Sequence, residues 1–428
     1  MCYNTNMMKN KTREISNAVS NMKTSVLTFA NHVSAGLKKP QKKFIADMLY
    51  GMMCSQDVKL TKVAESLKEE YKLKHTEERL RRNANDFDES EKIADNYMQR
   101  VVRKTRSDTL LLVDGGDISK PYGSNFEGLC EVRDGSTGKI GKGFPTVGII
   151  ALTNDKLPVP VYENIYSYTQ NFISENHETF KALDFADKHF SKENIRVFDR
   201  GYDSNIITKK LLETKIKFIV RINENVRTVI HNGKEINIGE LAAKFKGKYA
   251  LDYTNQKGKK KHCKISVVQI ELPKFPGETF NLVICNGFSN KPMLLITNVF
   301  DDDNSICKSI AKCYLLRWKI EEFYRFKKQT FKFEDIRVMS LKAMNNINLL
   351  LNILIGFLSM KSTNGQDKPI IIALVNQVKR IYEPKNILYS VCAGLMVIMM
   401  IAGVGWRSPP AETSEYVQIN LVEFFIGS

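Results

Sequence analysis

The sequence predicts an α/β protein, and three observations support this fold class. Residues 1–106 carry apolar residues at spacings of three and four, which is typical of helices that bury one face. Short, largely apolar runs then alternate with helical segments, as expected of a sheet whose strands are buried on both faces. From about 223 to 300 the pattern alternates residue by residue, with turn signals at 232–233 and 276–277. We therefore expect a helical N-terminal domain, an α/β core and a β-rich insertion.

The composition is that of a globular protein with a strongly basic surface. The chain has 428 residues and a formal net charge of +17, so it has room for sizeable cores and favours a polyanionic partner. Nucleic acid is the commonest such partner, and an anionic membrane is the alternative. The eight cysteines form no CxxC pair and do not cluster with the six histidines. This argues against a zinc site and favours buried free thiols in a reducing compartment; the N-terminus carries no secretory signal.

The N-terminal region, residues 1–106, is predicted to contain helices at 17–36, 40–54, 58–71 and 89–106. Within it, 58–67 and 75–82 are predicted to be two short helices joined by a turn. Such a pair could be a helix-turn-helix that binds DNA, or it could be a plain packing module. The sequence does not decide between these two interpretations.

The core is predicted to consist of two parts: 107–222 is the first, and 301–405 contains the last part together with the C-terminal helices. Its first part should contain helices at 172–189 and 205–214, and Ser204 should cap the second of them. Its strands should lie at 109–113, 144–152, 159–163, 195–198 and 218–222. The β-rich insertion, 223–300, carries basic loops at 244–248 and 257–264, which are either solvated or bound to phosphates. Residues 293–297 should return to the core, and 406–428 form a tail.

Two apolar runs, 349–360 and 387–405, bear on membrane association. The second is about long enough to cross a bilayer, but Tyr389, Ser390 and several small residues interrupt it. We expect both runs to be buried helices that pack on the sheet, and we expect no membrane partner.

Two acids stand directly after predicted strands, Asp114 after 109–113 and Asp199 after 195–198. In open α/β sheets, ligands gather at the carboxyl ends of strands, and a divalent cation relieves the repulsion between two desolvated carboxylates. Glu321 could supply a third oxygen ligand. Two such ions can activate water and stabilise the leaving oxygen in phosphodiester cleavage. The alternative is that these acids are turn residues, and Asp117 is a rival to Asp114.

The segment 314–328 is predicted to be one long helix with a mixed-charge face. At about 100° per residue, four side chains fall within about 60° of each other: Tyr314, Arg317, Glu321 and Lys328. The side predicted to be buried carries Leu316, Ile320, Phe323 and Phe326. Such a face suits a metal ion held beside phosphate groups. The alternative is an ordinary surface ion pair of Glu321 with Arg317 or Arg325.

Taken together, these motifs resemble the DDE transposases of bacterial insertion sequences, in particular insertion-sequence family four. The resemblance covers about residues 105–360 and rests on Asp114-Gly-Gly, Asp199-Arg-Gly-Tyr and the spacing of Tyr314, Arg317, Glu321 and Lys328. It implies an RNase H-like core. It also implies two Mg²⁺ ions, with Mn²⁺ as a substitute, held by Asp114, Asp199 and Glu321. Tyr314, Arg317 and Lys328 would contact DNA near the cleaved phosphate.

The resemblance further implies a transposase that binds the terminal inverted repeats of its element, cleaves the DNA and transfers the ends to target DNA. It implies a homodimer on double-stranded DNA in the bacterial cytoplasm, associated with the nucleoid. The alternative is a catalytically silent, transposase-derived DNA-binding protein. The presence of all three acids together argues against that alternative.

Overall fold

The computed structural model describes residues 20–135, 138–223, 227–254, 258–289, 291–300, 306–363 and 387–402. The predicted tail at 406–428 lies outside these residues, as do Cys2 and residues 364–386 of the C-terminal helical region.

The N-terminal region is helical, as predicted. Residues 20–33 form a helix, and four more follow: α2 (Lys39–Ser55), α3 (Leu60–Leu67), α4 (Leu73–Asp86) and α5 (Ser90–Val102). Helix α3 ends where Lys68 adopts a left-handed conformation, with φ 46°. The continuous helix expected over 58–71 is therefore wrong, whereas the two short helices joined by a turn are confirmed.

The core contains every strand and helix predicted between 107 and 222. The strands are β1 (Leu111–Ser119), β2 (Cys130–Arg133), β3 (Ile140–Leu152), β4 (Pro158–Ile165), β5 (Arg196–Phe198) and β6 (Phe218–Ile222). The helices are α6 (Glu175–His189), the short 3-10 helix η1 (Arg200–Tyr202) and α7 (Asn205–Glu213). Ser204 caps α7, because its side chain accepts a hydrogen bond from the backbone N–H of Ile207.

The pairing of the strands brings the two aspartates together. Strand β1 pairs antiparallel with β3 on one side and parallel with β5 on the other, where Val113 lies opposite Phe198. Asp114 and Asp199 are the next residues along these two neighbouring strands. The strand predicted to end at Val113 continues to Ser119, because β1 keeps β3 as a partner after β5 has ended.

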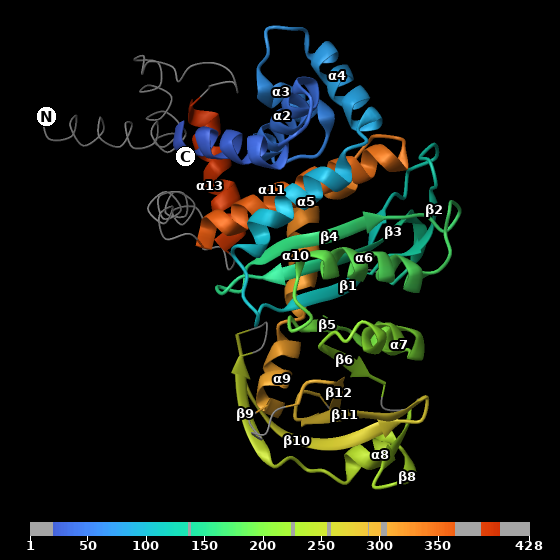
Figure 1. The fold of residues 1–428 in the computed structure, drawn as a ribbon. Coiled ribbons are helices and arrows are strands. Elements are labelled where there is room, and N and C mark those ends of the chain that lie inside the picture. The colour runs from blue at the N-terminus through green and yellow to red at the C-terminus, as the bar shows by residue number, and fades with distance from the viewer. Residues whose placement is uncertain are drawn as a thin grey trace, which may run out of the picture.

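The β-rich segment extends the same sheet. Its elements are β7 (Thr228–His231), β8 (Lys234–Asn237), α8 (Ile238–Ala243), β9 (Tyr249–Thr254), β10 (Lys260–Leu272), β11 (Phe275–Asn286) and β12 (Met293–Thr297). Strand β12 pairs with β6 on one side and β11 on the other, so the described strands form one 12-stranded sheet. Figure 1 shows this extension at the end of the molecule opposite the N-terminal helices.

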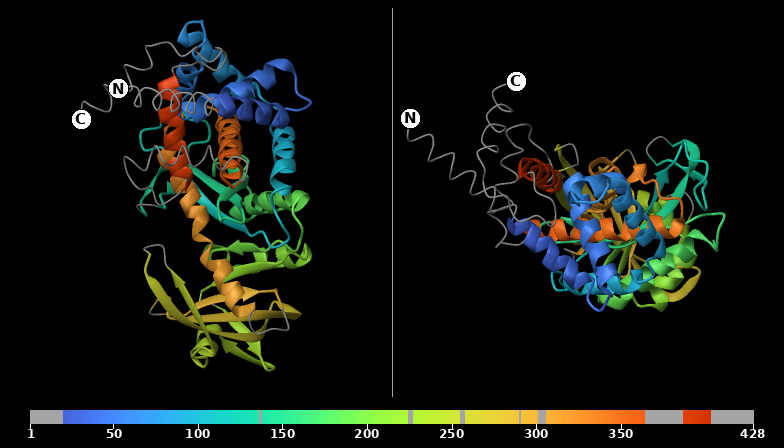
Figure 2. Two further views of the ribbon diagram at one scale, coloured as in Figure 1. Left: turned by 90° about the vertical axis from the view of Figure 1, so that its left-hand side faces the viewer. Right: turned by 90° about the horizontal axis from the view of Figure 1, so that it is seen from above.

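The C-terminal helices cover the sheet and join it to the N-terminal region. They are α9 (Ile306–Leu315), α10 (Trp318–Thr330), the 3-10 helix η2 (Phe333–Asp335), α11 (Leu341–Thr363) and α13 (Ile387–Ala402). Helix α10 contacts β1 and β4 on the face opposite α6 (Figures 1 and 2). Helix α11 is long and apolar enough to cross a membrane, but 89% of its most apolar window is buried inside the protein. Helix α13 packs on α2, α10 and α11.

The single helix predicted over 314–328 is wrong. The chain turns at Leu316 and Arg317, so α9 ends before the turn and α10 begins after it. The physical reason is that α9 packs against β10 and β11, whereas α10 packs against β1 and β4. Strands this far apart in a twisted sheet point in different directions, so one straight helix cannot follow both.

Candidate active site

Asp114 is much less exposed to solvent than Glu321, which is 47% exposed. The side chain of Asp114 is 16% exposed, and its Oδ1 accepts a hydrogen bond from the N–H of Gly115 at 3.0 Å. Burial raises the pKa of Asp114 to about 7, and although Arg317 opposes this, the negative charges of Asp199 and Glu321 raise it further. The three acids, far apart in the sequence, therefore act on one another electrostatically.

Asp199 lies beside Asp114 and is also a turn residue, which was the alternative that the sequence left open. It is the N-cap of η1, and its Oδ1 accepts the N–H of Gly201. Tyr202, the last residue of the Asp-Arg-Gly-Tyr motif, is partly buried near both aspartates, and burial followed by their negative charges raises the pKa of its hydroxyl. The motif thus orients the carboxylate of Asp199 and places Tyr202 close to both acids.

Arg317 bridges two of the acids. Its Nη1 lies 3.0 Å from Asp114 Oδ2, and its Nη2 bonds Glu321 Oε1. Burial alone would lower the pKa of Arg317, but the carboxylates of Asp114 and Glu321 outweigh it and raise this pKa. The Arg317–Glu321 pair considered from the sequence is therefore present, and the bridge to Asp114 ties it to the sheet.

Lys328 and Tyr314, the other two residues of the Tyr-Arg-Glu-Lys spacing, lie in different surroundings. Lys328 Nζ lies 3.3 Å from Asp117 Oδ2 and 2.9 Å from Glu334 Oε1. Tyr314 is only 7% exposed, and its hydroxyl bonds Arg221. Tyr314 also lies near Arg317 and Asp199, whose charges act on its hydroxyl, whereas Lys328 lies between Asp117 and Glu334. The four residues of the Tyr-Arg-Glu-Lys spacing therefore do not have one common set of neighbours.

A cleft of about 520 Å³ opens beside Asp114 and Glu321. Acidic and basic side chains both line it, and the lining residues are Asp114, Gly115, Gly116, Asp117, Ile118, Gly135, Thr146, Glu163, Glu321, Tyr324, Arg325, Lys327, Lys328, Gln329, Phe333 and Glu334. Asp117 lines this cleft too, but Asp114 is the one that follows the β5-paired part of β1 and lies beside Asp199. The structure therefore favours Asp114 over its rival as the partner of Asp199.

Three site residues were missed from the sequence. Tyr324 donates its hydroxyl to the backbone carbonyl of Asp114 at 3.1 Å, and a side chain at Gly148 would meet this hydroxyl at 2.5 Å. Tyr324 stands three residues after Glu321 on one helical face, which is a signal that could have found it. Lys327 pairs with Glu163 at 2.5 Å, and both side chains form part of the cleft wall. No local signal marks Glu163, since its partner is distant in the chain.

The three acids are chemically suited to a divalent cation, but their present arrangement is not that of a metal site. Carboxylate oxygens are the ligands that Mg²⁺ prefers, and Asp114 and Glu321 already share one cation, the guanidinium of Arg317. In the part of the chain that the structure describes, no three His, Cys, Asp or Glu side chains are arranged to hold a metal ion. The fit therefore depends on Arg317 leaving the space between the two carboxylates.

Comparison with known families identifies the class of protein. A family model for the transposase DDE domain matches residues 105–356, which is more than half of the chain. The chain therefore belongs to the transposase DDE-domain family. The matched region runs from before β1 into α11 and contains Asp114, Asp199 and Glu321. No curated protein gives a significant match.

Proposed function

We propose that this protein is the transposase of a bacterial insertion sequence of the family-four type. It binds the terminal inverted repeats, cleaves the DNA and joins the ends to target DNA. The observation that carries this proposal is the electrostatic coupling of Asp114 to Asp199 and Glu321 inside the region that matches the family. An RNase H-like core is part of the proposal, supported by a sheet in which two acids follow adjacent parallel strands.

In this proposal Asp114, Asp199 and Glu321 hold two Mg²⁺ ions, with Mn²⁺ as a substitute. When bound, the ions supply activation of the attacking oxygen and stabilisation of the leaving oxygen. Arg317 and Lys328 bind phosphates of the DNA beside the cleaved bond, Arg317 through its planar fork and Lys328 as a point charge. Tyr314 is buried on Arg221, so we propose that it acts by holding Arg221 rather than by touching DNA directly.

The proposed partner is double-stranded DNA, bound by two copies of the chain in the bacterial cytoplasm. The net charge of +17 supports a polyanionic partner. Affinity for DNA should then fall steeply with salt, with a log–log slope of about −0.9 for each phosphate contact. A flat salt response would argue against an interface made mostly with phosphates.

The test is to incubate the full chain with Mg²⁺ and duplex DNA that carries the element ends, and to measure strand cleavage and DNA binding separately. Without a divalent cation the Glu321→Gln variant should bind this DNA at least as tightly as the unchanged protein. In Mg²⁺ it should lose cleavage by more than about a hundredfold, because even residues that only orient metal ligands cost about 10–100-fold when changed. Glu322→Gln is the matched control, since its carboxylate pairs with Lys319 at 2.7 Å instead. Normal cleavage by Glu321→Gln would end the catalytic assignment.

One observation favours a second candidate, a transposase-derived protein that binds DNA without cutting it. Arg317 already pairs with both Asp114 and Glu321, and the described residues contain no group of three ready metal ligands. The same incubation separates the two candidates: specific binding without cleavage by the unchanged protein, in Mg²⁺ and in Mn²⁺, would establish the second.

A further inference from the structure

The position of Arg317 gives two carboxylates a shared counter-charge. Each of its two terminal nitrogens bonds a different acid, Asp114 on β1 and Glu321 on α10. Asp114 and Arg317 are each 16% exposed, so neither charge is well solvated. Removing either partner would leave a charge that is poorly compensated, which is strongly unfavourable. Arg317 can therefore leave these acids only if another cation takes its place and another anion receives it.

We propose, building on the function proposed above, that Arg317 exchanges partners: it pairs with Asp114 and Glu321 in the metal-free protein, and it moves to a DNA phosphate when these acids bind a divalent cation. A phosphate accepts the planar fork of Arg through two hydrogen bonds, as a carboxylate does. Glu321 is 47% exposed and lines the cleft, so the guanidinium bonded to it lies at the edge of the space that a phosphate would enter.

Two consequences follow for binding. Metal ions compete with Arg317 for the oxygens of Asp114 and Glu321, so the protein binds metal weakly when no DNA is present. DNA offers Arg317 a new partner and so strengthens metal binding, and by linkage metal strengthens DNA binding by the same factor. The exchange makes the site assemble fully only when DNA is present.

The first test is calorimetric titration of Mn²⁺ into the DNA-free full chain. Arg317→Gln removes the competing charge and should bind Mn²⁺ at least about tenfold more tightly than the unchanged protein, within the usual range of coupling between sites. Lys319→Gln is the control, because it removes one positive charge from the same helix but its partner is Glu322. Equal Mn²⁺ affinity of the unchanged protein and Arg317→Gln overturns the inference.

The second test is DNA binding by fluorescence anisotropy with and without Ca²⁺. Ca²⁺ should strengthen end-DNA binding by about tenfold in the unchanged protein and by much less in Arg317→Gln. Glu321→Gln separates the two proposals. If Mn²⁺ binds the unchanged protein and Arg317→Gln equally but not Glu321→Gln, the metal site stands and only the exchange is wrong. If none of the three binds Mn²⁺, both proposals fail.

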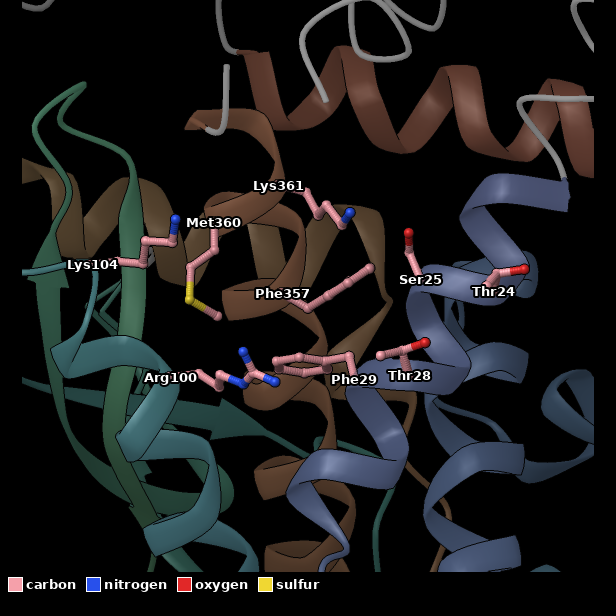
Figure 3. Close-up of a pocket in the computed structure, with 9 residues that line it drawn as sticks. All are labelled: Thr24, Ser25, Thr28, Phe29, Arg100, Lys104, Phe357, Met360 and Lys361. Carbon is pink, nitrogen blue, oxygen red and sulfur yellow. The ribbon is translucent and has the colours of Figure 1, made fainter. Parts of the chain in front are cut away.

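A different observation concerns a second cleft, of about 320 Å³, on the N-terminal side of the molecule. Figure 3 shows it between the helix at 20–33, the end of α5 and the end of α11. Three cations, three hydroxyls and three apolar side chains line it: Arg100, Lys104, Lys361, Thr24, Ser25, Thr28, Phe29, Phe357 and Met360. None of these described lining residues is acidic.

Two cations of this cleft, Arg100 and Lys104, form no ion pair with an acidic side chain among the described residues, unlike the cations of the catalytic cleft. The Nε of Arg100 is buried and has no hydrogen-bond partner among the described residues, and neither has the Nε2 of His32 nearby. Burial and then the positive charges of Arg100 and Arg103 lower the pKa of His32. In Figure 3 the guanidinium of Arg100 points toward Phe29 and into the cleft. A buried donor without an acceptor is unfavourable, so the site suits an anion.

We infer that this cleft binds a backbone phosphate of the DNA, which again depends on DNA being the partner. A phosphate offers acceptors for Arg100 and Lys104 and receives hydroxyl donors from the helix at 20–33. In the catalytic cleft, by contrast, Lys328 is already paired with Asp117 and Glu334. The second cleft therefore offers attraction that needs no exchange of partners.

The test compares the salt dependence of DNA binding in variants. Arg100→Gln and Lys104→Gln should each reduce the log–log slope by about 0.9, on end DNA and on random duplex alike, since phosphate contacts carry no sequence information. Lys188→Gln on α6 is the control, as an exposed lysine paired with Glu91. If the unchanged protein has a steep slope and both variants have the same slope, only the proposed phosphate site in this cleft is overturned. A flat slope in the unchanged protein overturns DNA binding as well. Binding of inorganic phosphate with unchanged DNA slopes would assign the cleft to a small anion instead.

Discussion

Helix α10 carries two groups of charges that differ in how completely they are enclosed. Lys327 and Glu163 are 1% and 3% exposed, whereas Arg317 and Glu321 are 16% and 47% exposed. Lys327 also bonds Asn348 and lies 3.8 Å from the centre of the Phe333 ring, and Asn352 donates to Glu163 at 3.0 Å. The Lys327 group, or closed group, is almost fully shielded from solvent, although its side chains form part of the cleft wall, while Glu321 of the Arg317 group, or open group, is half exposed on the same cleft.

This difference indicates how α10 can be held firmly against the sheet while Arg317, at its start, exchanges ion-pair partners. The closed group joins α10 to β4 and α11, so it holds the helix that carries Glu321 against the sheet. The open group lies about two to three helical turns away, at the start of the same helix, where solvent and DNA can reach it. Four predictions test this comparison.

The largest expected effect on stability is at the closed group. Lys327→Met leaves the carboxylate of Glu163 buried without its partner, so the free energy of unfolding should fall by about 3–5 kcal/mol in urea denaturation. Adding Glu163→Gln should recover much of this loss, because no buried charge then remains. A loss below about 1 kcal/mol in the single variant would show that the closed group does not hold the helix.

The next prediction concerns which aspartate works with Glu321. Asp114→Asn should reduce cleavage of end DNA by more than about a hundredfold, as expected for a direct metal ligand. Asp117→Asn should reduce it less, because Asp117 contacts Lys328 and the N–H of Gly135 rather than the other acids. The reverse order of these two effects in the cleavage assay would make Asp117 the ligand.

The open group should also show itself in the pH dependence of stability. Asp114 has a pKa of about 7 in the folded chain against an ordinary 3.8, so the folded state holds its proton more tightly than the unfolded state. Its contribution to stability is therefore complete below about pH 4 and is lost as pH rises through 7. The stability of Asp114→Asn relative to the unchanged protein should grow by about 2 kcal/mol between pH 5 and pH 8, measured by denaturation with a chelator present. A pH-independent difference would contradict this pKa.

The smallest expected effect is at the contact between α10 and the backbone of β1. Tyr324→Phe removes the hydroxyl that bonds the carbonyl of Asp114 and should lower the free energy of unfolding by about 1 kcal/mol. Because that bond helps to place Asp114, cleavage should fall as well. Unchanged cleavage together with lowered stability would show that Tyr324 supports the fold without positioning the acid.

The sequence carried much of the fold and the identity of the candidate acids. Largely apolar runs marked β1, β5 and β6, because strands buried on both faces carry few polar residues; Arg196 and Arg221 are the exceptions in β5 and β6. Asp114 and Asp199 stood out because each follows such a run. The break between α9 and α10 could not be predicted, since it depends on which strands each half packs against and not on a local helix-ending signal. The Lys327–Glu163 pair was hidden for the same reason.

What the sequence determined by itself was the order of the elements, the basic surface and the set of acids, because local periodicity and residue type decide these. Only the tertiary structure decided that Arg317 stands between Asp114 and Glu321, that Tyr314 turns inward and that the β-rich segment extends the core sheet. Each of these depends on contacts between segments distant in the chain, and burial then fixes the charge partners that a linear pattern cannot specify.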